Sequence, residues 1–346
     1  MPSSEPAACD LVAFDIGGAN LKAADGRGWS ATLGFPLWKQ WRDLPAALEQ
    51  ILAARRPERV VATMTGEICD CYPSRAAGVA HIAESLVAAA RAAGAGDPGI
   101  YLTDGRIVAA GEAIDAWRLA AASNWHAVAR LAASAASDRR GLLLDIGSTT
   151  TDIVPFDRGR VAATAFDDAG RMLAGELVYT GMERTAVAAI VRRLPHRGRS
   201  RPVASELFAE SRDAWLTLGG LADVAAAIDT ADGGPATVAA ARIRLARTML
   251  LDPADFTAAD ATTAAEAVAA RQATLITRAL RQVARAAGWA PDVIVVSGHG
   301  DVLARRALAT TGWQTEIESL ADAIGPANAR SAPAFALACI ARSELS

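Results

Sequence analysis

The first half of the chain alternates short apolar runs with longer segments in which apolar residues recur every three or four positions. Short apolar runs are typical of buried strands, and the longer spacing is typical of amphipathic helices. This alternation predicts an α/β domain. The predicted strands are 11–14, 59–64 and 100–103, and the predicted helices are 45–54, 76–93 and 120–136.

The second half begins with the same pattern and then changes. Residues 142–144 and 151–156 predict two strands joined by a tight turn, and residues 183–287 are mostly of helical spacing with breaks at Pro and Gly clusters. The apolar, β-branched run 293–296 predicts the last strand. Pro333 stands at the favoured first-turn position of a terminal helix over 334–342.

The motif Asp-Ile-Gly occurs once in each half, at 15–17 and at 145–147. An apolar strand precedes each copy and a second strand follows it, so each copy predicts a β-hairpin. A repeat in the same context favours duplication of one domain plan, with equivalent loops facing each other across a cleft. The predicted domains are 1–140, on which the terminal helix 333–346 is expected to pack, and 141–332, with a helical insertion at about 183–290.

The two turns combine residue types that suit a phosphate site. Glycine lets backbone N–H groups approach phosphate oxygens, because no Cβ intervenes. Asp15 and Asp145 stand where a carboxylate can hold Mg²⁺, which favours carboxylate and phosphate oxygens. The alternative is that an Asp-Gly turn only closes a hairpin. The predicted phosphate-binding residues are Gly17, Gly18 and Asn20 in the first turn and Gly147, Ser148, Thr149 and Thr150 in the second.

Composition and charge argue against several classes of protein. The net charge is -3 and no dense basic run occurs, so a nucleic-acid partner is not expected. Residues 1–10 lack the pattern of a secretory signal, and no apolar run approaches the roughly 20 residues of a spanning helix, which predicts a cytoplasmic protein without membrane contact. The four cysteines have no zinc spacing and predict reduced thiols; a redox or metal pair at Cys69 and Cys71 is the alternative.

Several segments together resemble one family. The chain resembles the actin-like ATPase superfamily and, within it, the hydantoinase/oxoprolinase-like proteins of the tetrahydromethanopterin-linked one-carbon pathway. The resemblance runs from about 11 to 296 and implies two ribonuclease H-like domains that face each other across a central cleft. The segments that carry it are 14–22, 35–38, 63–67, 122–125, 145–153 and 175–181.

The same resemblance implies a reaction in the biosynthesis of methanofuran or methylofuran. The enzyme would join (aminomethyl)furanmethyl diphosphate to the phenol of γ-glutamyltyramine, or of a tyrosine-type acceptor, and release pyrophosphate. A diphosphate leaving group needs charge stabilisation of the kind that the two turns and Mg²⁺ offer. The expected partners are small molecules, and an oligomer is possible.

Roles follow for single residues. Lys22 would neutralise the diphosphate, or is a solvated charge at a strand end. Glu67 is the first choice of general base for the phenol, and Asp152 and Glu176 are the other candidates. Arg171 and Arg184 would bind a carboxylate of the glutamyl arm, or form surface salt bridges.

The organic part of the substrate needs a pocket of its own. Asn124 and Tyr179 are predicted to line it, whereas Trp125 is predicted to lie in the hydrophobic core. Gly298 belongs to the loop 297–300, which in nucleotide-binding relatives lies against adenosine; a plain strand-to-helix connection is the alternative.

Two rival functions fit the same turns. The first is an ATP-dependent small-molecule kinase of the actin-like superfamily, which would need a catalytic Asp and an adenosine loop. The second is a nucleotide-binding sensor without catalysis.

Overall fold

A computed structural model describes residues 9–344. The chain forms two compact units. Unit 1 comprises Met1–Gly141, Pro155–Arg171 and Glu318–Ser346, and unit 2 comprises Leu142–Val154 and Met172–Ile317. The predicted boundary near residue 140 therefore falls where the first unit is interrupted, and two later segments return to unit 1. Most of residues 1–10, which were expected to lack a secretory signal, lie outside the described residues.

Unit 1 is built on a six-stranded mixed sheet with the order β3-β2-β1-β4-β5-β6. The predicted strands are confirmed, while β3 and β6 were not predicted; β3 is interrupted by polar residues and β6 is only three residues long. The strands are β1 (Leu11–Ile16), β2 (Asn20–Ala24), β3 (Ser30–Gly34), β4 (Arg59–Met64), β5 (Gly99–Tyr101) and β6 (Ile107–Ala109).

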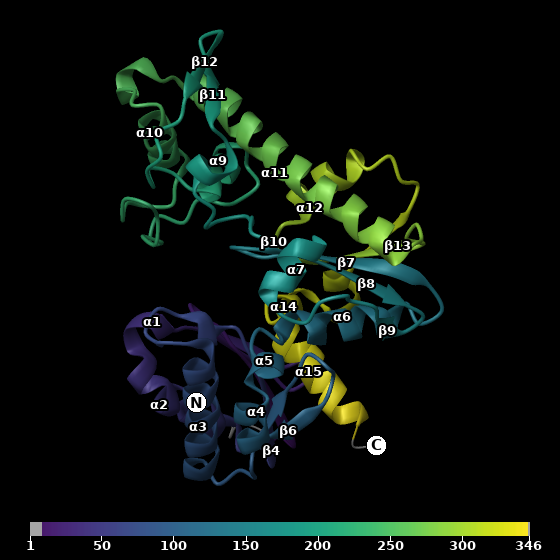
Figure 1. Ribbon diagram of the computed structural model, residues 1–346. Helices are drawn as coiled ribbons and strands as arrows, with labels where there is room; N and C mark the ends of the chain where they lie inside the picture. The colour runs from purple at the N-terminus through teal and green to yellow at the C-terminus, as the bar shows by residue number, and fades with distance from the viewer. Residues whose placement is uncertain (1–8, 345–346) are drawn as a thin grey trace, which may run out of the picture. The chain divides into compact units, whose positions relative to one another are not determined.

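Helices cover both faces of this sheet, which explains why every residue of β1 is buried. Val12, Phe14 and Ile16 pack with α2 (Leu44–Arg55) and α3 (Arg75–Ala92). Leu11 and Ala13 pack on the opposite face with α15 (Ala332–Ser343) and α6 (Asn124–Ala135). Figure 1 shows α15, in yellow, lying beside α6. The terminal helix thus completes unit 1, and its Pro333 stands in the first turn.

The helix predicted over 120–136 is confirmed only from Asn124 onward, and its predicted start at residue 120 is wrong. A short helix, α5 (Trp117–Ala120), ends before the segment 121–123, and α6 begins at Asn124. Ala122 has φ 50°, a left-handed conformation that cannot continue a right-handed helix. The Ser123 hydroxyl shares a buried 2.7 Å hydrogen bond with the hydroxyl of Thr63 at the end of β4. The break therefore brings polar groups to the end of the sheet. The remaining helices of unit 1 are α1 (Leu37–Gln40), α4 (Ala110–Asp115), α13 (Leu320–Ile324) and α14 (Pro326–Ala329), with 3-10 turns η1 (Trp41–Asp43) and η2 (Gly66–Ile68).

The second sheet has the order β10-β8-β7-β13-β14, and β9 pairs with β8. Leu142, Leu144 and Ile146 of its central strand pack with α11 (Ala258–Ala287) and α12 (Asp301–Ala309). The strands are β7 (Arg140–Ile146), β8 (Thr151–Asp157), β9 (Arg160–Val161), β10 (Leu177–Val178), β13 (Val293–Gly298) and β14 (Glu316–Ser319), and α7 (Asp168–Ala174) precedes β10.

The predicted helical insertion is only partly helical. Residues 193–202 form an antiparallel hairpin of β11 (Arg193–His196) and β12 (Arg199–Pro202), where only a break was expected. Pro195 and Pro202 lack the N–H that a helix interior needs, which disfavours a helix here. The helices of this region are α8 (Val187–Ile190), α9 (Ser211–Thr217), α10 (Val238–Thr248) and the first half of α11, with the 3-10 turn η3 (Pro253–Asp255).

The two sheets repeat one plan, as the duplicated motif predicted. In each, a hairpin whose turn follows Asp-Ile supplies two adjacent inner strands, and the other neighbour of the first hairpin strand is a later strand, β4 or β13. Gly17 N–H donates to Asn20 O at 3.0 Å, and Gly147 N–H donates to Thr150 O at 3.0 Å. The two turns are therefore closed in the same way.

Between residues 9 and 344, no helix is long and apolar enough to cross a membrane.

Candidate active site

The first turn is held by backbone hydrogen bonds from the segment that follows β3. Leu37 N–H donates to Gly18 O at 2.8 Å, and Phe35 N–H donates to Ala19 O at 2.9 Å. In a planar trans peptide the C=O and the next N–H point in opposite directions. Because these carbonyls are tied back, the N–H groups of Ala19 and Asn20 face away from the segment 35–37. Such a row of N–H groups is suited to a phosphate.

The second turn is held in the same manner by the residues after β10. Met182 N–H donates to Gly147 O at 3.0 Å, and the N–H groups of Glu183 and Arg184 both donate to Ser148 O at 2.9 Å. The N–H groups of Ser148 and Thr149 then face away from the segment 182–184 by the same peptide geometry. Both sequence-predicted turns thus have the backbone arrangement of an anion site.

A loop after a neighbouring strand packs on each turn. Thr65 N–H donates to Ile16 O at 3.0 Å in unit 1, and His299 N–H donates to Ile146 O at 3.1 Å in unit 2. Gly298 has φ 80°, and a Cβ there would lie 2.2 Å from Ile146 O and 2.7 Å from Asp145 Oδ1. Only glycine fits this approach. The predicted loop 297–300 therefore lies directly on the second turn.

Asp15 and Lys22 face each other across the first hairpin. They are register partners, and Lys22 Nζ lies 3.5 Å from Asp15 Oδ2. Asp15 is 3% exposed, and its Oδ1 has no hydrogen-bond partner among the described residues. Burial raises the pKa of Asp15 above its ordinary value, and the Lys22 charge opposes that shift. Lys22 is one cation beside this carboxylate, and a metal ion at Oδ1 would be a second. The Asp15 carboxylate therefore fits the role of a metal ligand.

The second hairpin carries two acids where the first carries an acid and a lysine. In the first hairpin, Asp15 and Lys22 are the second residue pair back from the Gly17–Asn20 hydrogen bond. The same count from the Gly147–Thr150 hydrogen bond places Asp152 opposite Asp145. Asp152 is also the register partner of Leu177 on β10. Asp152 therefore corresponds to Lys22, and the second turn has the donor set of a divalent-cation site.

Glu67 is an almost completely buried acid in η2. It is 1% exposed, and neither carboxylate oxygen accepts a hydrogen bond from any described residue. Burial raises the pKa of Glu67 to about 7; nearby backbone N–H groups and the Arg75 charge offset only part of this effect. A group with that pKa can accept or donate a proton near neutral pH.

The backbone around Glu67 is closely packed. A Cβ on Gly78, in the first turn of α3, would lie 2.3 Å from the Glu67 carbonyl oxygen. A Cβ on Gly66 would lie 2.5 Å from Leu37 Cδ2 and 3.2 Å from the carbonyl oxygen of Gly17. The segment that carries Glu67 is thus fixed against the first turn. Two of the segments that carry the family resemblance, 35–38 and 63–67, meet here.

The aromatic residues predicted for the organic pocket differ in exposure. Trp125 is 2% exposed, and the Arg171 guanidinium lies 3.9 Å from its ring centre, so Trp125 belongs to the core, as favoured from the sequence. The alternative that Arg171 forms a salt bridge on the surface is wrong, because Arg171 is 1% exposed. Asn124 begins α6, and its Oδ1 accepts a hydrogen bond from the Trp125 N–H at 2.8 Å.

The remaining candidates of unit 2 differ in burial. Tyr179 is 61% exposed, and Glu176 is buried. Arg184 is exposed, so it is open to a carboxylate of either a ligand or the protein.

Three residues beside the second turn were not predicted. Glu183 Oε1 accepts hydrogen bonds from Ser148 Oγ at 3.1 Å and from His299 Nε2 at 3.0 Å, and Glu183 Oε2 lies 2.7 Å from Arg212 Nη2. They come from three separate parts of the chain, and no spacing in the sequence relates them. The only available signal was the position of His299 in the glycine loop 297–300.

The cysteines near the first turn do not support a redox or metal role. Burial raises the pKa of Cys69 to about 11 and also raises that of Cys71, so both are protonated and unreactive at neutral pH. A Cβ on Gly18 would lie 2.9 Å from Cys69 Sγ, so the thiol packs on the turn. In the part of the chain that the structure describes, no three His, Cys, Asp or Glu side chains form a metal cluster.

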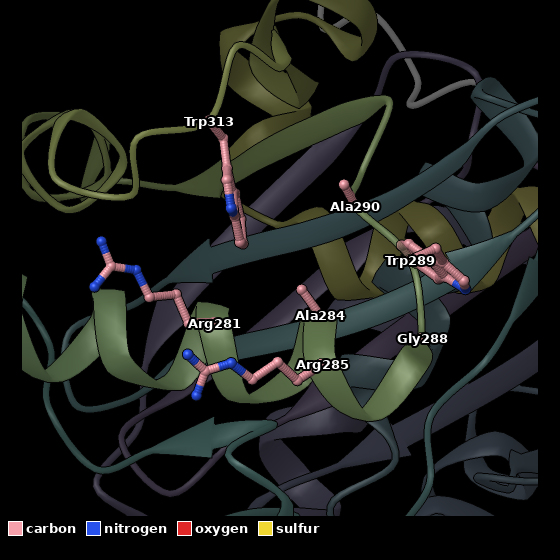
Figure 2. A pocket seen from close by; sticks show the side chains of 7 residues that line it. All are labelled: Arg281, Ala284, Arg285, Gly288, Trp289, Ala290 and Trp313. Carbon is pink, nitrogen blue, oxygen red and sulfur yellow. The ribbon is translucent and has the colours of Figure 1, made fainter.

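A surface hollow of about 510 Å³ lies elsewhere in unit 2. Figure 2 shows Arg281 and Arg285 on the last turns of α11 and Trp313 pointing toward them from another segment. None of the predicted site residues lines it. The hollow is therefore separate from the two turns.

Comparison with known proteins relates most of the chain to one family. The family model for hydantoinase/oxoprolinase matches residues 58–344. The chain is 31% identical over 247 residues to a Methanocaldococcus jannaschii protein named (4-{4-[2-(gamma-L-glutamylamino)ethyl]phenoxymethyl}furan-2-yl)methanamine synthase, covering 70% of this chain and 72% of that protein. It is 28% identical to a Methanococcus vannielii protein of the same name, covering 60% of this chain and 93% of that protein.

A solved structure supports the fold. The chain is similar to a nucleotide-free acetone carboxylase with a TM-score of 0.52 and 13% identity, covering 93% of this chain and 51% of that one. At this identity the likeness shows the fold alone. The α/β prediction with actin-like domains is confirmed.

Proposed function

The chain belongs to the hydantoinase/oxoprolinase family, and from that premise we propose that it is an ether-forming synthase. It joins (aminomethyl)furanmethyl diphosphate to the phenol of γ-glutamyltyramine, or of a tyrosine-type acceptor, and releases pyrophosphate. The observation that carries this proposal is the likeness to synthases whose name describes a phenoxymethyl-furan amine with a γ-glutamylaminoethyl arm. The two anion-binding turns support it, because a diphosphate is the leaving group.

The bond changes assign a task to each group of residues. The bond between the furfuryl methylene carbon and the diphosphate oxygen breaks, and its electron pair leaves with pyrophosphate. The phenol oxygen forms a new bond to the methylene carbon and loses its proton. The protein must therefore stabilise negative charge on the diphosphate and accept one proton.

Backbone N–H groups of the two turns are the proposed diphosphate donors. Gly17, Gly18 and Gly147 allow the close approach, and Asn20 adds a side-chain amide. Lys22 supplies positive charge, and its 3.5 Å contact with Asp15 keeps it at the turn.

Glu67 is the proposed acceptor of the phenol proton. Its pKa of about 7 lies closer to that of a phenol than an ordinary carboxylate's pKa does, which makes proton transfer less unfavourable. Asp152 is less suited to this task, because its position opposite Asp145 matches a cation site.

Mg²⁺ is the proposed cofactor. Asp15 is the candidate ligand in unit 1, and Asp145 with Asp152 are the candidate ligands in unit 2. When bound, Mg²⁺ would neutralise part of the charge that develops on the diphosphate. Substitution of Asp15→Asn and of Asp145→Asn should each weaken Mg²⁺-dependent activity. Full activity in both variants would contradict the metal role.

Asn124, Tyr179 and Gly298 are the proposed neighbours of the organic groups. Tyr179 is exposed and can stack on a furan or phenol ring. Gly298 keeps the loop 297–300 close to the second turn, where a side chain would collide.

Incubation of the purified protein with Mg²⁺ and the two substrates tests the proposal. Ether product and pyrophosphate should appear in equal amounts by mass spectrometry and a pyrophosphate assay. Absence of the ether, together with ATP turnover on a panel of small molecules, would contradict the proposal and favour a kinase. Tight ATP binding without turnover would favour a sensor.

A further inference from the structure

Four residues meet beside the second turn, and we call them the Glu183 junction: Ser148, Glu183, Arg212 and His299. They come from the turn itself, from the segment after β10, from α9 and from the loop after β13. Three donors meet at one carboxylate: Ser148 Oγ at 3.1 Å, His299 Nε2 at 3.0 Å and Arg212 Nη2 at 2.7 Å. The loops around the turn are therefore tied together by a single side chain.

The direction of the serine hydrogen bond follows from the charge of Glu183. Glu183 is ion-paired with the guanidinium of Arg212, whose Nη2 lies 2.7 Å from Oε2, and an arginine guanidinium stays charged in a protein. An ionised carboxylate only accepts hydrogen bonds. The Ser148 hydroxyl must therefore donate its hydrogen to Glu183.

A serine whose hydrogen is already donated presents only lone pairs to other neighbours. It cannot donate a hydrogen bond to a phosphate oxygen, but its oxygen can bind a hard cation. The corresponding residue of the first turn is Gly18, which has no side chain. Any such role is thus specific to the second turn.

The surroundings of Ser148 match a cation rather than a bare anion. Asp145 lies at the end of the same strand, with its Oδ1 close to Gly298, and Asp152 stands opposite in the hairpin. Magnesium typically takes one or two carboxylates together with phosphate oxygens. The hydroxyl oxygen of Ser148, in the same turn, would be a further protein ligand beside these carboxylates.

We propose that Ser148 Oγ is a ligand of the divalent cation that accompanies the diphosphate, and that Glu183, His299 and Arg212 are positioning residues that fix its hydroxyl. The proposal rests on the proposed function for the diphosphate and extends it to the metal. It replaces the expectation that Ser148 donates a hydrogen bond to phosphate.

The positioning residues are anchored well enough for this task. Arg212 is 5% exposed and makes two hydrogen bonds with Asp229, at 2.8 and 3.0 Å. Its own backbone N–H donates to Glu183 O at 3.2 Å. Arg212 therefore cannot leave Glu183 without losing several contacts.

Binding of inorganic pyrophosphate, measured by calorimetry with and without divalent cation, tests the proposal without the furan substrate. Ser148→Ala should weaken binding in Mg²⁺ about tenfold or more, and should leave metal-free binding little changed. Ser148→Cys should be weak in Mg²⁺ and recover in Cd²⁺, because a thiolate prefers a softer metal. Pyrophosphate binding by the wild type in Cd²⁺ is the control for any effect of Cd²⁺ on the four native cysteines.

Variants of the positioning residues separate this role from simple packing. Glu183→Gln should weaken Mg²⁺-dependent pyrophosphate binding about tenfold, the usual cost of losing a group that orients a metal ligand. His299→Asn keeps an N–H donor and should retain most binding, whereas His299→Leu should not. Asp301→Asn is the matched control, because Asp301 begins α12 directly after the loop and pairs with Arg305. The pyrophosphate binding of this variant should equal that of the wild type.

Two results would overturn the proposal. One is Mg²⁺-dependent pyrophosphate binding in Ser148→Ala equal to that of the wild type; the other is a Ser148→Cys variant without any gain in Cd²⁺. If wild type binds magnesium pyrophosphate as expected but forms no ether, the proposed reaction fails and the assignment of Ser148 stands.

Discussion

At the scale of the residue, Glu67 is distinguished by having a buried carboxylate without a hydrogen-bond partner. Its pKa is raised from 4.5 to about 7, so the folded state favours the protonated form. The stability that this carboxyl contributes is fully present below pH 4.5 and is lost as the pH rises through about 7. The difference amounts to about 3 kcal/mol.

Glu67→Gln should therefore be more stable than wild type at pH 8 and similar to it at pH 4. The amide is neutral at both pH values, so it avoids the cost of a buried charge. Thermal unfolding at the two pH values measures this, and a constant difference between the proteins would contradict the raised pKa.

The same substitution tests the role of Glu67 in proton transfer. Wild-type kcat should rise as the pH rises through about 7, because the carboxylate form accepts the phenol proton. Glu67→Gln should lose about 10²- to 10⁴-fold in kcat, the usual contribution of a general base, and the pH-dependent rise. Unchanged kcat would assign the base elsewhere.

The contact of Lys22 with Asp15 is a second residue-scale feature. Lys22→Met should destabilise the protein at pH 7 by about 1–3 kcal/mol, because it leaves a buried carboxylate with less compensation. Asp15→Asn combined with Lys22→Met should recover part of the loss. Urea unfolding of the four proteins in this cycle gives the coupling energy, and additive effects would show that the pair is not coupled.

At the scale of the element, the loop after β13 depends on Gly298. Gly298→Ala should cost several kcal/mol, because its Cβ would lie 2.2 Å from Ile146 O and its φ is 80°. Gly288→Ala, at the end of α11, is the matched control. Gly288 has φ 77° with no atom within 4 Å of its Cβ position, so only the backbone strain of about 1 kcal/mol applies. Equal losses in urea unfolding would show that the close approach to β7 is unimportant.

Elements with a continuous apolar pattern could be predicted from the sequence, and others could not. β1, β4, β7 and β13 are buried runs, and each was predicted. β3 is partly exposed and has no such pattern. The break between α5 and α6 depends on Ala122, which has an unusual left-handed conformation that local preference disfavours.

At the scale of the whole molecule, the repeated Asp-Ile-Gly motif predicted the duplicated plan. The same backbone bonds close both turns, and a loop after a neighbouring strand packs on each. The Glu183 junction could not be predicted, because it joins residues far apart in the chain. The electrostatic difference between the hairpins depends on Lys22 and Asp152 standing at equivalent positions, which becomes evident from the register.

The most direct test of the central claim uses γ-glutamyltyramine labelled with ¹⁸O in its phenol. With the furan diphosphate and Mg²⁺, the ether product should carry the label and the released pyrophosphate should not, because the phenol oxygen attacks the methylene carbon. Mass spectrometry of both products measures this. Label in the pyrophosphate, or no ether at all from an enzyme that binds magnesium pyrophosphate, would contradict the account.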